Sequence, residues 1–227
     1  MKNIIFFLGL FILFNFSCKT DKKQKEITPK EVVPSIPEKI AYTSGFKNWE
    51  KVKEIQFSFN VDRDTSHFER KWIWNTRKNK VTRIIKSDTV SYKRNTLDSI
   101  SKKINGGFIN DKFWLLAPYN LVWDSKNYTY THSESSISPL AKEELQKLTI
   151  VYGNKGGYTP GDAYDFYFDK GYKIKEWVFR KGNQEEPSMT TTWEDYLIEH
   201  GIHIAKMHKK EGDNFKLYFT DLKILVD

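Results

Sequence analysis

The chain has 227 residues, of which 39% are hydrophobic and 15% are aromatic, and its formal net charge is +8. This length supports one domain with a sizeable core, and a single cysteine excludes an internal disulfide, so the fold must depend on its own packing. The basic residues are dispersed among acidic ones rather than gathered in one stripe. The charge therefore does not indicate a nucleic-acid-binding protein.

Residues 1–17 have the pattern of a secretory signal peptide. Lys2 supplies a short positive region, and Ile4–Phe14 form an almost unbroken hydrophobic run. That run is too short to span a bilayer core of roughly 30 Å comfortably. Ser17 directly before Cys18 resembles the lipobox of bacterial lipoproteins, in which this cysteine is acylated and becomes the mature N-terminus. We predict lipidation at Cys18, with an uncleaved anchor or an ordinary signal peptide as the alternatives.

Residues 18–39 predict a disordered tether between the lipidated cysteine and a folded domain over residues 40–227. The segment is rich in Lys and Glu, contains Pro29, Pro34 and Pro37, and has no periodicity. Lys19 stands where an aspartate would signal retention at the inner membrane in some bacteria. The expected location is therefore the outer membrane, on its periplasmic face or at the cell surface.

The first half of the domain predicts an antiparallel meander with a helical insertion. A short amphipathic helix is expected over residues 42–53 and another helix over 97–104, with Gly106-Gly107 as its stop and helical residues again at 110–116. Ser138-Pro139 predict the start of a short helix that ends at Leu145. Alternating apolar residues predict strands in these segments: 54–61, 68–74, 81–86, 89–94, 121–123 and 128–132.

The last third returns to strands, with a tight hairpin signal at Asp169-Lys170-Gly171. Strands are expected in these segments: 148–152, 163–168, 172–180, 190–196, 202–207 and 215–225. An antiparallel sheet of this size tends to curl. The predicted fold is mainly β (α+β): one strongly curved antiparallel sheet of about ten or eleven strands, forming an unclosed half-barrel with two or three short helices as a lid or plug.

The polar residues predict neither a catalytic site nor a metal site. His200 and His203 lie three apart on an expected strand, so they would face opposite sides. Asp165 and Asp169 fit the solvent face of a strand, and the pattern lacks the spacing of a calcium loop, a nucleophile elbow or a phosphate loop. The remaining candidates are expected to be surface histidines or turn aspartates: His67, His132, His208, Asp62, Asp64 and Asp162. We predict no catalytic residue, no metal and no cofactor.

The aromatic residues carry the functional prediction. Most are expected to fill the core, but a half-barrel has a wide interior, and some can line a cavity for an acyl chain or a similar hydrophobic ligand. The candidates each lie on an alternating face: Phe57, Phe59, Trp72, Trp74, Tyr164, Phe166 and Phe168. Sequence alone does not show which face is concave.

Three segments are similar to a group of bacterial envelope lipoproteins: FINDKFWLLAPYNLVWD (Phe108–Asp124), YGNKGGYTPGDAYDFYFD (Tyr152–Asp169) and TTWEDY (Thr191–Tyr196). With the acylated cysteine, the tether and the order of elements, the chain from Ala41 to Asp227 resembles the LolA/LolB superfamily of lipoprotein carriers. The resemblance implies a half-barrel that holds acyl chains in an apolar cavity under a helical lid. It provides no arginine or loop motif that is diagnostic of a lipoprotein carrier.

Two hypotheses follow. The first is a lipid-anchored, monomeric binding protein whose half-barrel holds a lipid or acyl chain, with lipoprotein or lipid trafficking as its role. The alternative is a non-catalytic structural or protein-interaction lipoprotein with a filled core and an exposed apolar patch. The sequence identifies no protein partner for either.

Overall fold

The computed structural model describes residues 33–212 and 214–227, and Pro34–Asp227 form one compact unit. The predicted signal peptide and Cys18 lie outside the described residues. Twelve strands are distributed between two antiparallel sheets, and neither sheet closes within the described residues. The helices are α1 (Ile36–Thr43), α2 (Ser99–Trp123) and the 3-10 turns η1 (Phe46–Lys51) and η2 (Lys181–Asn183).

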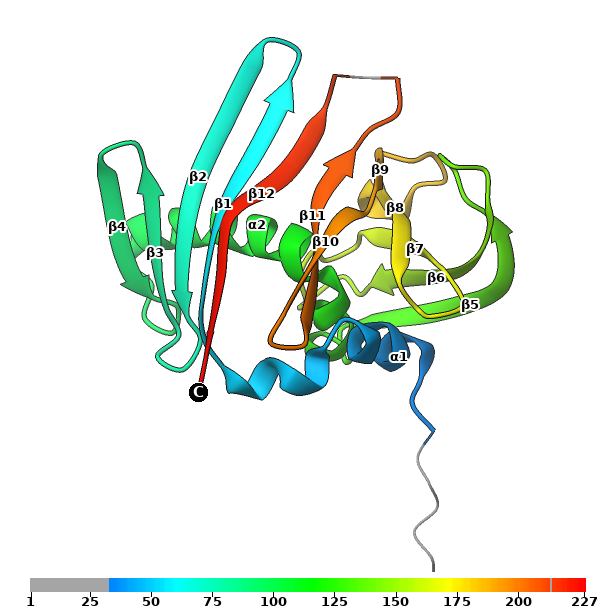
Figure 1. The fold of residues 1–227 in the computed structure, drawn as a ribbon, viewed down its shortest axis with the longest axis horizontal. Helices are drawn as coiled ribbons and strands as arrows, with labels where there is room; N and C mark the ends of the chain where they lie inside the picture. Colours follow the sequence, from blue (N-terminus) through cyan, green and yellow to red (C-terminus); the bar gives the residue numbers. More distant parts are fainter. Residues whose placement is uncertain (1–32, 213) are drawn as a thin grey trace, which may run out of the picture. The chain divides into compact units, whose positions relative to one another are not determined.

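The larger sheet combines the first and last parts of the domain (Figure 1). The C-terminal strand pairs with the first strand along its length, so the two ends of the domain lie side by side in the middle of one open sheet. In spatial order the sheet consists of β10 (Glu194–Glu199), β11 (Ile202–Lys209), β12 (Lys216–Val226), β1 (Val52–Arg63), β2 (Ser66–Asn75), β3 (Lys80–Ile85) and β4 (Asp88–Lys93).

The smaller sheet is a simple meander in sequence order. It consists of β5 (Tyr128–Ile137), β6 (Glu144–Tyr152), β7 (Ala163–Phe168), β8 (Ile174–Arg180) and β9 (Met189–Thr192). Every residue of β7 is buried, although its sequence alternates between apolar and polar residues. The polar face of this strand is therefore covered as well.

The mainly β, unclosed antiparallel fold is confirmed, but its strands form two sheets rather than one. The predicted strand over residues 190–196 is interrupted at Trp193, which separates β9 from β10. Trp193 is 3% exposed, and its ring lies 5.8 Å from Trp177 and 4.6 Å from His208. A buried indole thus occupies the junction at which the chain crosses between the sheets.

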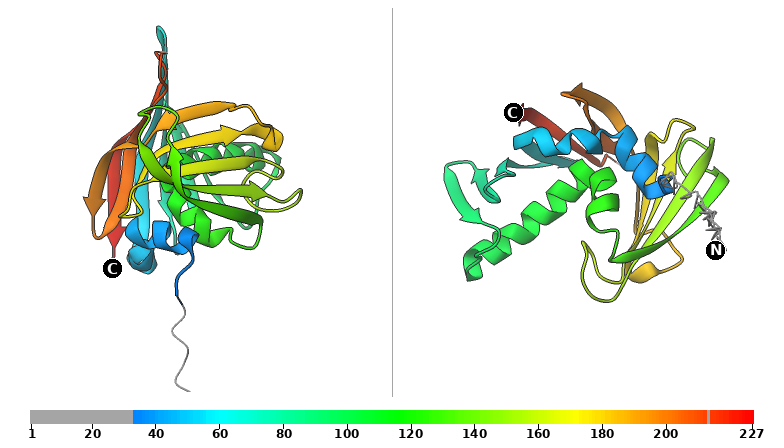
Figure 2. Two further views of the ribbon diagram at one scale, coloured as in Figure 1. Left: turned by 90° about the vertical axis from the view of Figure 1, so that its right-hand side faces the viewer. Right: turned by 90° about the horizontal axis from the view of Figure 1, so that it is seen from below.

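Helix α2 lies against both sheets (Figure 2). Its Phe108 ring is 5.4 Å from Trp72 of the larger sheet, and its Phe113 ring is 5.0 Å from Tyr164 of the smaller one. Asp98 caps the helix by accepting a hydrogen bond of 2.7 Å from the Ser101 amide. The predicted plug is therefore a single long helix.

Several local predictions were wrong. Helix α2 continues through Gly106-Gly107 and residues 121–123, because packing against two sheets outweighs the roughly 1 kcal/mol that a glycine costs. The helix predicted from Ser138 to Leu145 is a hairpin turn, closed by the Ser138 amide bonding to the Glu143 carbonyl. Helix α1 begins at Ile36, inside the segment expected to be tether.

Gly106→Ala should stabilise the protein by about 0.5–1 kcal/mol. Gly106 is exposed on α2, and a Cβ there would have no atom within 4 Å. At neighbouring Gly107, a Cβ would lie 2.9 Å from the Arg70 guanidinium. Chemical denaturation of both variants checks this, and a Gly107→Ala gain as large as that of Gly106→Ala would contradict it.

Candidate ligand pocket

The structure places all seven predicted ligand-binding aromatics in one hydrophobic core cluster. Their exposed fractions are all between 0 and 7%. Phe57 and Phe59 contact Phe219, and Trp72 contacts Phe108 of α2. The interior between the sheets is thus largely filled by side chains from the sheets and the plugging helix. A ligand contact at these residues stays a prediction.

Trp74 differs from most of this set because it lines a cavity of about 390 Å³. A second member, Phe168, lines a separate cleft of about 350 Å³ beside Glu134, Glu144 and Lys170. The Trp74 cavity, called the tryptophan pocket here, is lined by Trp49, Trp74, Thr76, Arg94, Ile109, Lys112, Asn120, Trp123, Asp124, Gly157 and Tyr158. Its volume is at the small end of the usual range for ligand sites, about 300–1,000 Å³.

Three indoles form the apolar wall of the tryptophan pocket. Trp49 comes from η1, Trp74 from β2 and Trp123 from the last turn of α2. Their ring centroids lie 5.6 Å apart for Trp49 and Trp74, 5.1 Å for Trp49 and Trp123, and 6.5 Å for Trp74 and Trp123. Trp49 and Trp123 keep partial exposure, so the wall is open to an incoming molecule.

A kink in α2 brings its two halves to the same pocket. Leu116 has non-helical angles (φ −126°, ψ 29°), and Pro118 interrupts helical hydrogen bonding in the preceding turn. The Asn120 side chain spans the kink: its Nδ2 donates to the Leu116 carbonyl at 3.1 Å, and its Oδ1 accepts from Lys112 Nζ at 3.0 Å. The ammonium of Lys112 is therefore held in place by the second half of the helix.

The pocket contains two cationic side chains and one carboxylate. Lys112 is 9% exposed, and its Nζ lies 4.7 Å from the Trp123 ring centroid. Burial, followed by repulsion from the Arg94 guanidinium, lowers the pKa of Lys112 to about 7, and Asp124 opposes this shift. The pocket therefore contains a lysine that gains or loses its charge near neutral pH, and this lysine lies beside an aromatic wall.

Asp111 fixes the same helix to the larger sheet. Its two oxygens accept hydrogen bonds from Arg70 Nε and Nη2 at 2.5 and 2.7 Å, and Oδ2 also accepts from Trp72 Nε1 at 2.7 Å. The Asp111 side chain is fully buried. The neighbouring residues Asp111 and Lys112 thus have different surroundings: one carboxylate is neutralised by the sheet, and one ammonium lines the pocket.

The histidine and aspartate predictions hold only in part. His67 is exposed on β2, but His208 is fully buried on β11, and His200 lies in the turn between β10 and β11 rather than in a strand. Asp165 is also buried, because Arg180 pairs with it from Nε and Nη2, both at 3.1 Å. Periodicity alone did not predict that Arg180 covers this face.

Two aspartate predictions were wrong: Asp62, expected in a turn, lies within β1, and Asp169, expected on the solvent face of a strand, lies in the β7–β8 turn. Asp64 lies in the β1–β2 turn, and Asp169 Oδ1 accepts hydrogen bonds from the Gly171 and Lys173 amides. Asp162 accepts a hydrogen bond of 2.7 Å from the Gly182 amide and so joins two loops. These carboxylates stabilise turns.

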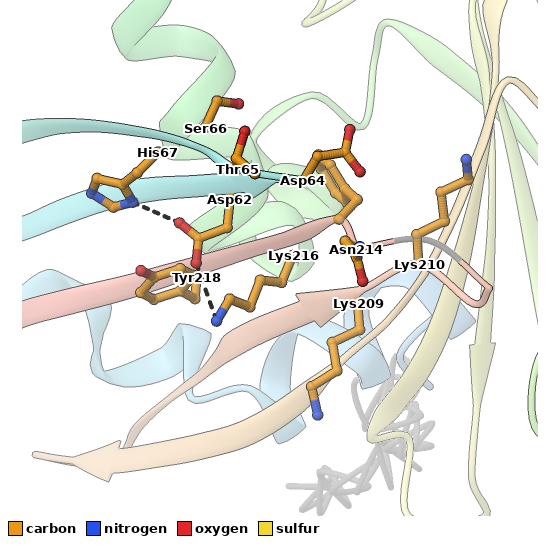
Figure 3. A pocket seen from close by; sticks show the side chains of 11 residues that line it. Asp62, Asp64, Thr65, Ser66, His67, Lys209, Lys210, Asn214, Lys216 and Tyr218 are labelled. Carbon is orange, nitrogen blue, oxygen red and sulfur yellow. Dashed lines mark hydrogen bonds and ion pairs between the residues drawn. The ribbon is translucent and has the colours of Figure 1, made fainter.

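A larger cavity of about 680 Å³ lies between the tips of the β1–β2 and β11–β12 hairpins. Figure 3 shows Asp62 at its centre, bound to His67 Nδ1 at 2.6 Å and to Lys216 Nζ at 3.1 Å. The hydrogen bond from His67, followed by Lys216, lowers the pKa of Asp62. Charged and polar side chains make up most of this cavity's lining, which contains no tryptophan.

Residues 33–212 and 214–227 contain neither a cluster of metal-ligating side chains nor a membrane-spanning helix. In this part of the chain, no three His, Cys, Asp or Glu side chains come together as metal ligands. None of the helices there has both the length and the apolar character needed to cross a membrane.

Comparison with protein-family models gives no match, and neither does comparison with curated proteins. Solved structures do match in fold. A LolA superfamily protein of Nitrosomonas europaea aligns with a TM-score of 0.50 and 9% identity, over 84% of this chain and 92% of that one. An outer membrane lipoprotein-sorting protein domain of Vibrio parahaemolyticus gives 0.46 and 12%, over 82% and 89%. A DUF1329 family protein of Desulfovibrio piger gives 0.45 and 9%, over 85% and 94%. The chain is thus similar in fold to the LolA superfamily protein.

Proposed function

We propose that the protein is an envelope lipoprotein that binds a hydrophobic molecule, of the size of a lipid acyl chain, in the tryptophan pocket. The observation that carries this proposal is the wall of Trp49, Trp74 and Trp123 around a cavity of about 390 Å³. Fold similarity to a LolA superfamily protein supports it. The proposal includes no catalytic step, and trafficking of lipids or lipoproteins is the role that such binding would serve.

The proposal includes the organisation inferred from the sequence. Residues 1–17 direct export, and Cys18 carries the lipid that anchors a monomer at the outer membrane. Residues 18 to about 35 are the tether, and the folded unit follows, with its first helix at Ile36. The anchored domain can then reach hydrophobic molecules at the membrane surface.

Trp49→Ala and Trp123→Ala should each weaken binding of phenylnaphthylamine, an uncharged fluorescent probe, by about tenfold or more. Removing an indole removes roughly 1.5–3 kcal/mol of apolar contact. Fluorescence titration of the full chain carrying Cys18→Ser measures this, and Tyr130→Ala, at an exposed aromatic on β5, is the matched control. Equal affinity in all three variants would contradict the proposed pocket.

One observation favours the alternative, a structural or protein-interaction role. The seven predicted aromatics are almost completely buried, as a filled core requires. One exposed large hydrophobic, Val33, precedes α1. The others within the described residues are spread over five different elements: Phe68, Ile100, Tyr130, Ile137, Ile198 and Leu225. If phenylnaphthylamine does not bind, this second function is favoured.

A further inference from the structure

We propose that the hydrophobic ligand is an anionic amphiphile, a carboxylate or a phosphate monoester, whose charged head lies between Lys112 and Arg94. This inference rests on the proposed function, because it assigns the chemistry of the ligand in the same pocket. Both cations line the cavity together with the three tryptophans. A ligand with an apolar chain and an anionic end would match both halves of the lining.

Within the described part of the chain neither cation forms an ion pair, although the Asp124 carboxylate lines the same pocket. Lys112 Nζ makes one hydrogen bond, to the neutral Asn120 amide, and Arg94 Nε makes one, to Asn105 Oδ1 at 3.1 Å. An ammonium has three donors and a guanidinium has five, so most of their donors are unused within residues 33–212 and 214–227. A buried cation without an anion is costly, and a bound carboxylate or phosphate would remove that cost.

The Arg70–Asp111 pair is a buried ion pair whose charges are neutralised within the chain, without a ligand. There a guanidinium and a carboxylate form two parallel hydrogen bonds, and Trp72 donates a third. One residue further along α2, Lys112 has no such carboxylate within the described residues. The contrast indicates that the missing anion is supplied from outside the chain.

A third donor belongs to the same lining. Trp74 Nε1 is buried and has no hydrogen-bond partner among the described residues. Trp72, its neighbour on the same face of β2, donates its indole N–H to Asp111. Buried indole N–H groups usually have an acceptor. Because the Trp74 Nε1 atom is buried, a ligand oxygen would reach it only after the indole ring shifted.

The charged and titratable groups that face Lys112 set the expected pH dependence. Arg94 follows β4, and burial lowers its pKa from an ordinary value so high that the guanidinium stays protonated. Asp124 ends α2. Tyr158, in the β6–β7 loop, has its pKa raised well above 10 by burial and stays neutral. Lys112 has a pKa of about 7 in the empty pocket and is the group that titrates near neutrality. Affinity for octanoate, a carboxylate, should therefore fall as the pH rises from 6 to 9.

Calorimetric titration of the full chain carrying Cys18→Ser tests the inference with octanoate, octyl phosphate, octanol, octyltrimethylammonium and inorganic phosphate. Octanoate and octyl phosphate should bind at least about tenfold more tightly than octanol and the cation. Lys112→Met and Arg94→Gln should each lower the affinity for octanoate and octyl phosphate by a larger factor than the affinity for octanol. Lys103→Met is the matched control, since it removes an exposed lysine from the same helix.

The outcomes separate the two proposals. Equal binding of octanol and octyl phosphate would overturn the anionic head and leave the proposed function standing. A preference that survives both Lys112→Met and Arg94→Gln, in variants with native circular dichroism, would place the anion elsewhere and overturn the inference. Inorganic phosphate bound as tightly as octyl phosphate would overturn the amphiphile. If no probe bound, both proposals would fall.

Discussion

Replacing Asp111 with alanine should lower the free energy of unfolding by about 3–5 kcal/mol. The substitution leaves Arg70, which is mostly buried, and the Trp72 indole N–H without their acceptor. It also loosens the contact between α2 and β2, which positions Lys112 and the pocket. Denaturant titration measures the loss.

Asp88→Ala is the control, because Asp88 pairs with Arg83 while its side chain remains 61% exposed. That substitution should cost about 1 kcal/mol or less. The double variant Arg70→Met/Asp111→Leu should recover much of the lost stability, since it removes both buried charges together. An Asp111→Ala loss no larger than that of Asp88→Ala would show that the buried pair does not hold the helix.

Acidification should destabilise the protein through His208. Burial lowers the pKa of His208 from 6.5 to about 3, and its ring packs among Trp114, Trp193 and Phe219. The unfolded chain therefore takes up the proton first as the pH falls. The contribution of neutral His208 to the free energy of unfolding is fully present above about pH 6.5. Each unit of pH below that value should lower the free energy of unfolding by about 1.4 kcal/mol, until the pH approaches 3.

Denaturation curves of the parent and of His208→Phe between pH 7 and pH 5 test this expectation. The variant should have a much shallower pH dependence, whatever its stability at pH 7. Parallel slopes for the parent and His208→Phe would mean that His208 does not account for the acid sensitivity.

Alternation along the chain predicted most strands, since period-two patterns depend on local geometry. Predictions from alternation failed where contacts between residues far apart in the sequence determine the local structure. Gly106-Gly107 suggested a helix end, but helix α2 has aromatic partners on both sheets and continues. His208 resembled a surface residue because the indoles that enclose it, Trp114 and Trp193, are far from it in sequence or outside its strand.

The tryptophan pocket was predicted only through Trp74. Trp49 and Trp123 were missed because they lie on a 3-10 turn and a helix end, where no alternating face marks them. The segment DKFWLLAPYN contained a usable signal: a charged pair, Asp111 and Lys112, stands inside an otherwise apolar run. Charges there need partners, and only the structure shows that Asp111 has one from β2 while Lys112 points to the pocket lining.

Native mass spectrometry of the full chain carrying Cys18→Ser, purified without detergent and incubated with octyl phosphate, tests the central claim most directly. The account predicts one bound ligand per chain, lost in Trp49→Ala/Trp123→Ala and in Ile109→Trp, which fills the cavity from a half-buried lining position. The second variant keeps the aromatic wall intact. A chain that stays unliganded, or a bound mass that persists in both variants, would contradict binding in this pocket.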